Sequence, residues 1–311
     1  MVSLPYRSRT RILTQLLQRL GLGFLTAFAA LTLTFFILRL IGTDPVDSLL
    51  AQGLTSAEQA ESVRQELGLD QPLLTQYVEY LSGLLRGDFG ISLYTQRPVL
   101  QTILEQFRWT VELALTGLVI GILSGLAMGV TAAWWENRFI GSFAATLASL
   151  LTALPVAFTG ILALWFTRDL GISGSKIVMP ASVLGLSISG AIARLVYSNL
   201  LESLHGPYIL AAQARGIQRS FRLLWHALRP ILPALVSLIA LEAAFLFAGT
   251  VVTETVFSRP GLGRLMVRAI LDGDYQITQG LVALAALFYT ASHIIADWLA
   301  LMFDPRLRET A

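Results

Sequence analysis

Few residues of this sequence could perform covalent chemistry, and those few form no recognised catalytic pattern. The chain has no cysteine and only three histidines, so it lacks a thiolate nucleophile and has little material for a metal cluster. A Walker A loop requires Gly-Lys-Ser/Thr, whereas the only lysine, Lys176, follows Ser175 and precedes Ile177. The spacings HExxH, GxSxG and CxxC are absent. We therefore expect no catalytic residue, no metal site and no cofactor in this chain, and any ATP must be hydrolysed by another subunit.

Residues 198–229 indicate chemistry of another kind, the docking of a partner protein. Their pattern predicts a short helix over Pro207–Arg215, a break at Gly216 and a second helix over Gln218–Leu228. Small side chains on the first helix would let a partner's backbone approach closely, with aromatic and basic residues beside them. The residues predicted to couple to the partner are Tyr208, Ala211, Ala212, Ala214, Arg215, Gly216 and Arg219. The alternative is a basic surface loop without a partner.

Glu242, Glu254 and Pro155 are candidates for a transport pathway or a subunit interface. Glu242 lies near the middle of an apolar segment, where an ionisable side chain is costly and often functional. Pairing with a second subunit or with a backbone donor would also satisfy it. Glu254 and the following turn SRPGLG could form part of an outer mouth, or only a short helix closed by a Pro-Gly turn. Pro155 interrupts another apolar segment and predicts a kink or break there.

Membrane-spanning helices are the elements that must position these residues. The chain is 55% hydrophobic and 14% charged, with a mean hydropathy of +0.67, far more apolar than a soluble domain. A bilayer needs about 20 apolar helical residues, because lipid offers the backbone no hydrogen bonds. The sequence therefore predicts an all-α membrane protein with six spans: Leu20–Ile41, Trp109–Ala133, Ile140–Phe166, Ile177–Tyr197, Ile231–Thr253 and Gln279–Phe303. Within the second span, close helix packing is predicted along one face that carries Gly117, Gly121, Gly125 and Gly129.

The distribution of basic residues predicts the orientation. With a cytoplasmic N-terminus, the inner segments are about twice as dense in Lys and Arg as the outer ones, so we expect both termini in the cytoplasm. The first apolar stretch is too long for a signal peptide. The predicted organisation is a cytoplasmic segment 1–19, a first span 20–41, an extracytoplasmic segment 42–108, a core 109–303 containing the loop 198–229, and a cytoplasmic tail 304–311. The net charge of +2 and scattered basic residues argue against binding of nucleic acid.

These residues and several others along the chain resemble the inner-membrane permease subunits of ABC importers. Leu210, Ala211, Ala212 and Gly216 occupy the places of their coupling motif E-A-A-x3-G, with leucine replacing the glutamate. The dipeptide, oligopeptide and nickel branch varies the motif as H-x-L-R followed by proline, here His226, Leu228, Arg229 and Pro233. Further matches are Gly87-Asp88-Phe89-Gly90, Arg97-Pro98-Val99, Thr110 with Glu112-Leu113, Glu254 with Phe257, Pro260-Gly261-Leu262-Gly263, Asp274-Tyr275 and Asp304-Pro305-Arg306.

The resemblance implies the type I importer permease fold and a set of partners. It implies a second permease, usually a different chain, two ATPase subunits that bind ATP and Mg²⁺, and an extracytoplasmic binding protein that delivers substrate. Residues Tyr208–Arg222 would insert into a groove on one ATPase and transmit its closure to the spans. In a bacterial inner membrane, surrounded by lipid, the chain would form half of the pathway for di- or oligopeptides, nickel or metal-opine chelates, with some lean towards nickel and metallophore transport.

Two other classes of protein remain open from the residues alone. A secondary transporter driven by an ion gradient would show an internal repeat with paired broken helices and buried acids. A membrane-embedded enzyme would need a nucleophile and a base, or metal ligands, at one depth. No repeat and no recognised spacing of this kind is visible in the sequence.

Overall fold

The computed structural model describes residues 6–40, 44–51, 53, 55–66, 68–169 and 177–303. The predicted tail 304–311 and parts of the predicted segments 1–19 and 42–108 lie outside these residues. The described chain forms two compact units. The first contains residues 111–259 and the second contains residues 18–110 and 260–290, with the terminal residues 1–17 and 291–311 assigned to the first. The described residues form no sheet, only an isolated bridge between Ile91 and Pro98, so the all-α expectation holds for them.

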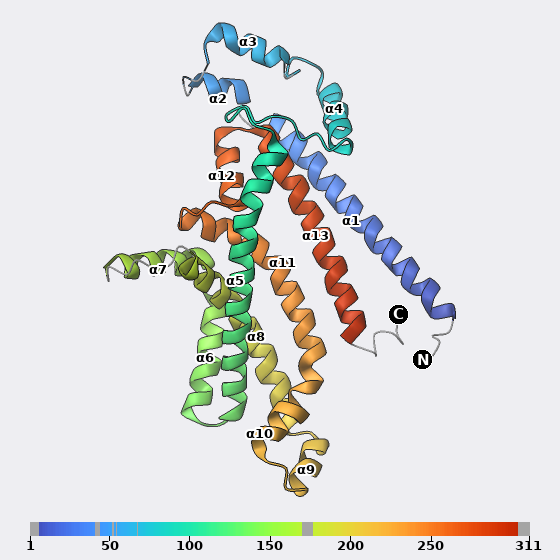
Figure 1. The fold of residues 1–311 in the computed structure, drawn as a ribbon, viewed down its shortest axis with the longest axis vertical. Coiled ribbons are helices and arrows are strands. Elements are labelled where there is room, and N and C mark those ends of the chain that lie inside the picture. Colours follow the sequence, from blue (N-terminus) through green and yellow to red (C-terminus); the bar gives the residue numbers. More distant parts are fainter. Residues whose placement is uncertain are drawn as a thin grey trace. The chain divides into compact units, whose positions relative to one another are not determined.

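The first unit is a bundle of apolar helices. It contains most of α5 (Val99–Trp134), then α6 (Phe139–Ala153), α7 (Val156–Asp169), α8 (Val178–Leu204) and α11 (Leu232–Val256) (Figure 1). Helix α8 is the centre of the unit, because its buried side chains join a core to which α5 and α11 also contribute. Apolar side chains otherwise remain exposed on the outer helices, as expected of helices that face lipid.

The predicted glycine face of α5 packs against α8. A Cβ atom added to Gly121 would lie 2.5 Å from Ile188, and one added to Gly125 would lie 2.8 Å from Ile192. Gly117 and Gly129 meet α8 in the same way, one turn earlier and later, at Ala181 and at Ala193. The four-residue spacing of the glycines therefore matches a four-residue spacing on α8, and the prediction of close packing on this face is confirmed.

The third predicted span, Ile140–Phe166, is not one straight helix. Helix α6 ends at Ala153, α7 begins at Val156, and the two helices meet at an angle of 106° around Pro155 (Figure 1). Proline lacks the backbone N–H that would continue the helix and clashes with the preceding turn. The prediction of a break is confirmed, but the segment is a sharply bent pair of helices.

Four described stretches are long and apolar enough to cross a membrane: Leu20–Leu40, Val99–Trp134, Val178–Leu204 and Arg219–Leu246. The bent pair α6 and α7 makes a fifth if it counts as one span. The sixth predicted span, Gln279–Phe303, falls on α13 (Tyr275–Phe303), where most side chains after Ser292 are outside the described set. The helices confirm a multi-pass protein, whereas the number six stays a prediction.

The second unit contains short helices between two long ones. After α1 (Tyr6–Leu40) come α2 (Pro45–Ala51), α3 (Ala57–Glu66) and α4 (Leu73–Leu85), then the start of α5, and later α12 (Leu262–Asp272) and the first part of α13. Ser56 caps α3, since the backbone N–H of Gln59 donates to its hydroxyl at 3.3 Å and Gln59 Oε1 accepts the Ser56 N–H at 3.2 Å. Short helices therefore make up much of the described part of segment 42–108.

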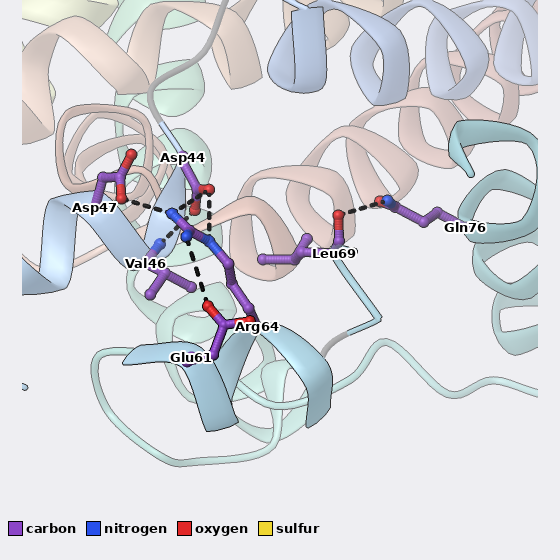
Figure 2. A network of polar contacts seen from close by, with 7 residues as sticks. All are labelled: Asp44, Val46, Asp47, Glu61, Arg64, Leu69 and Gln76. Carbon is purple, nitrogen blue, oxygen red and sulfur yellow. Dashed lines mark hydrogen bonds and ion pairs between the residues drawn. The ribbon is translucent and has the colours of Figure 1, made fainter. Parts of the chain in front are cut away.

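Two polar hubs hold the short helices of this unit together. Arg64 on α3 donates to Asp47 at 2.7 Å and to Asp44 at 3.1 Å, which ties α3 to the start of α2 (Figure 2). Gln76 on α4 is buried, donates to the carbonyl oxygen of Leu69 at 3.2 Å, and accepts a hydrogen bond from Arg39 Nε at 2.7 Å. The second hub therefore joins the end of α1 to α4.

Candidate coupling segment

The loop between α8 and α11 folds into a compact elbow. It contains α9 (Pro207–Ala214), the single α-helical turn α10 (Arg219–Phe221), a π-helical turn Arg222–Ala227 and a 3₁₀ turn Arg229–Ile231 (Figure 1). The first predicted helix is confirmed to within one residue. The second is wrong in detail, because it begins at Arg219 and widens into a π-turn before the prolines that precede α11.

Gly216 ends α9 in the way that only glycine does readily. Its φ is +74°, its N–H donates to the Gln213 carbonyl at 2.9 Å, and the N–H of Ile217 donates to the Ala212 carbonyl at 3.1 Å. These two bonds form a Schellman motif, which satisfies carbonyls that would otherwise lack partners at the helix end. The predicted break at Gly216 is therefore a defined turn with fixed direction.

Arg219 and Arg222 hold the elbow in place. Arg219 donates to the backbone oxygen of Trp134 at 2.6 Å, and its guanidinium lies 4.8 Å from the centre of the Trp134 ring. A cation at the last carbonyls of α5 also interacts favourably with the helix dipole. Arg222 donates to Gln213 on α9 at 2.7 Å. Arg219 thus anchors the segment to α5, a role that the sequence did not predict for it.

The seven residues predicted to couple to a partner differ in exposure. Tyr208, Ala211, Ala214, Arg215, Gly216 and Arg219 are exposed, whereas Ala212 is only 5% exposed. Ala212 faces the same way as Ile209, which belongs to the core of the first unit. The accessible surface of the elbow also includes Leu210 of the coupling motif and three large apolar side chains that the sequence analysis did not single out: Phe221, Leu224 and Trp225.

The three candidates for a pathway or interface occupy different environments. Glu242 is partly buried on α11, and Pro155 is exposed at the bend between α6 and α7. Glu254 is fully buried and lies in the last turn of α11, which continues past the predicted end at Thr253 to Val256. The structure does not bring the three residues together in one described pocket.

A groove of about 610 Å³ lies in the first unit instead, lined by small residues of α5, α6 and α8 and by Leu238 of α11. Arg194 is the one charged residue among those that line it, and its side chain is exposed. Small residues on three helices line much of this hollow, and none of the three sequence-predicted candidates is among its lining residues.

Several motifs of the resemblance form polar ties within a unit. In the first unit, Arg259 is 7% exposed and lies 2.9 Å from a carboxylate oxygen of Glu112. In the second unit, the N–H of Leu262 donates to Thr110 at 2.8 Å, and Ser92 donates to Asp274 at 2.6 Å. Asp274 also accepts the N–H of Ile277 at 3.2 Å at the start of α13. These residues therefore fix turns and helix ends.

Comparison with known proteins agrees with this architecture. Residues 12–114 match the N-terminal part of binding-protein-dependent transport system membrane components, and residues 117–309 match the binding-protein-dependent transport system inner membrane component. The glutathione transport system permease protein GsiC of Salmonella typhimurium (strain LT2) is 33% identical over 306 residues, which cover 96% of this chain and 99% of the relative. GsiC of Escherichia coli (strain K12) is 32% identical over 291 residues, covering 91% and 95%.

Solved structures show the same fold. An inward-facing structure of the MetNI methionine ABC transporter gives a TM-score of 0.52 at 20% identity and covers 64% of this chain and 97% of its own. An amino acid ABC transporter solved with histidines gives 0.53 at 16% identity, covering 66% and 94%. This chain therefore belongs to the inner membrane components of binding-protein-dependent transport systems, and it is a permease subunit of an ATP-driven importer of the peptide and oligopeptide family.

Proposed function

We propose that this chain forms half of a translocation pathway for a small peptide and is driven by an ATPase that docks on the elbow 207–231. Its partners would be a second permease chain, two ATPase subunits and an extracytoplasmic binding protein. ATP and Mg²⁺ would be bound by the ATPase, and this chain would perform no catalysis. Both termini would face the cytoplasm of a bacterial cell, as the distribution of Lys and Arg predicts.

The observation that carries the coupling proposal is a fixed elbow with an exposed apolar surface. Tyr208 is 44% exposed, Leu210 60% and Trp225 61%, and exposed apolar patches outside the spanning helices are typical of surfaces that bind another protein. The anchors of the segment, Arg219 to Trp134 and Arg222 to Gln213, join this surface to α5 and α9. Movement of a docked partner would therefore be transmitted to the spanning helices instead of being absorbed by a loose loop.

Relatives that transport glutathione support a small peptide as the substrate. They favour the peptide side of the family over the nickel and metal-opine chelates that the sequence also left open. The described residues hold no group of three or more His, Cys, Asp or Glu side chains placed to bind a metal. The relatives named above give no support to a secondary transporter driven by an ion gradient.

Purification of the assembled complex tests the coupling proposal. Ala211→Arg places a large cation on the exposed face of α9, so we expect the ATPase to be lost while the second permease stays bound. Ala51→Arg at an exposed position of α2 is the matched control and should retain both partners. Ala212→Arg is unsuitable, because Ala212 is buried and its replacement would disturb folding. Retention of the ATPase by Ala211→Arg, with ATP-driven uptake intact, would refute docking at this surface.

A further inference from the structure

A polar cavity in the second unit has no role in the coupling mechanism. It has a volume of about 220 Å³ and lies where the end of α1, helix α4 and the start of α13 come together. Arg39 comes from α1, Tyr80 from α4, and Gln276 and Gln279 from α13. Three separate segments of the sequence therefore contribute polar side chains to one hollow.

Each of these four side chains has a buried polar atom without a hydrogen-bond partner among the described residues. The atoms are Arg39 Nη1, Tyr80 Oη, Gln276 Oε1 and Gln279 Nε2. Buried polar groups in proteins are nearly always hydrogen-bonded, and leaving one unpaired costs about 1–3 kcal/mol. Four such atoms at one cavity indicate an occupant that supplies their partners.

The guanidinium of Arg39 is held ready for such an occupant. Its Nε donates to Gln76 Oε1 at 2.7 Å, and its central carbon lies 3.7 Å from the centre of the Phe35 ring. Gln76 in turn donates to two backbone carbonyls, so the whole arrangement is fixed from behind. One edge of the guanidinium is thus used for positioning, while Nη1 has no hydrogen-bond partner among the described residues.

The four unpaired polar atoms indicate which kind of ligand the cavity could bind. Arg39, Tyr80 and Gln279 offer N–H or O–H donors, and burial raises the pKa of the Tyr80 phenol, so its proton is retained. A guanidinium with converging donors suits a carboxylate or phosphate. However, Glu79 and Asp88 also line the cavity, and Asp88 is already engaged by the Gly90 N–H at 2.9 Å. The lining of the cavity therefore carries both a guanidinium and two carboxylates, which favours a ligand with both an oxyanion and a cation over a simple anion.

We propose that this cavity binds a zwitterionic head group, with its oxyanion on Arg39, Tyr80 and Gln279 and its ammonium group towards Gln276, Glu79 and Asp88. Two sources share this chemistry: the α-amino-acid end of a small peptide, and the head group of phosphatidylethanolamine. The first source rests on the proposed function, because it makes the cavity a substrate site. The second does not, since Arg39 lies at the end of the apolar, largely exposed helix α1, and a lipid head group is expected at the end of a membrane-spanning helix.

Tyr80→Phe is the sharpest test, because it removes only a hydroxyl that has no partner among the described residues. Tyr77→Phe is the matched control on the same helix: its hydroxyl lies 2.7 Å from Thr32 Oγ1, and it does not line the cavity. The assembled complex would be titrated with glutathione and with glycylglycine by calorimetry. The same complex from nanodiscs of phosphatidylethanolamine or phosphatidylglycerol would be examined by native mass spectrometry for retained lipid.

Loss of one hydrogen bond to a charged group predicts about tenfold weaker binding in Tyr80→Phe and little change in Tyr77→Phe. Such an effect on peptide binding supports a substrate site, and such an effect on phosphatidylethanolamine retention supports a lipid site. If Tyr80→Phe changes neither measurement, the cavity holds water and the proposal is overturned. ATP-driven peptide uptake by that same variant would show that the proposed transport function stands even so.

Discussion

The glycine seam between α5 and α8 gives a prediction whose size follows from the structure. A Cβ atom at Gly121 would lie 2.5 Å from Ile188 Cγ1 and 2.8 Å from the Gly185 carbonyl oxygen, whereas ordinary contact begins at 3.4 Å. The two helices would have to separate by roughly 0.6 to 0.9 Å to admit one carbon atom. The carbonyl is part of a helix backbone and Ile188 is buried, so neither can move aside alone.

Gly121→Val should therefore destabilise the permease by about 2–3 kcal/mol, the upper part of the range for overpacking. Because about 1 kcal/mol lowers the melting temperature by roughly 2–4 °C, we expect a decrease of about 5–10 °C in detergent or nanodiscs. Gly21→Val on α1 is the control, since nothing lies within 4 Å of its added Cβ. Thermal unfolding of both variants, followed by intrinsic fluorescence, provides the measurement. Equal melting temperatures would refute close packing of α5 on α8.

Three more predictions concern the elbow and the polar ties. Gly216→Ala should destabilise the elbow by about 1–2 kcal/mol, because the φ of Gly216 is +74°, and it should lower transport-coupled ATPase activity. Gly53→Ala is the control, because Gly53 has a φ of +69° but lies outside the elbow, and it should leave that activity unchanged. Arg219→Lys keeps the charge but loses the guanidinium that lies over the Trp134 ring, so we expect weaker coupling with normal membrane insertion; full coupling would contradict the anchor. Burial raises the pKa of Asp274 above 3.8, so the folded state favours the protonated form, and the associated stability is lost as pH rises through the raised pKa. Asp274→Asn should therefore show a flatter melting profile above pH 4, and an unchanged profile would argue against this titration.

Local patterns were enough to predict that the described chain is helical, that a break occurs at Pro155 and that the chain turns at Gly216. Each of these follows from an interaction that neighbouring residues decide: proline removes a backbone donor, glycine adopts positive φ, and a long apolar run must bond within itself in lipid. The spacing of the glycines on α5 likewise showed that a helix would pack there. It could not show that the partner is α8, because packing partners are set by side chains far apart in the sequence.

The sequence predicted only part of the candidate coupling surface. Composition and the small-residue pattern located the candidate coupling segment, but Ala211 and Ala212 look alike in a sequence. Only the packing of α9 against the core decides that Ala211 is exposed and Ala212 is buried. Arg219 became an anchor because the end of α5 happens to lie beside it. The cavity of Arg39, Tyr80 and Gln279 left no trace in the pattern, since its walls come from three distant segments. The sequence determines what each short segment can be, whereas tertiary packing determines which side chains meet, because those meetings depend on contacts that no local period encodes.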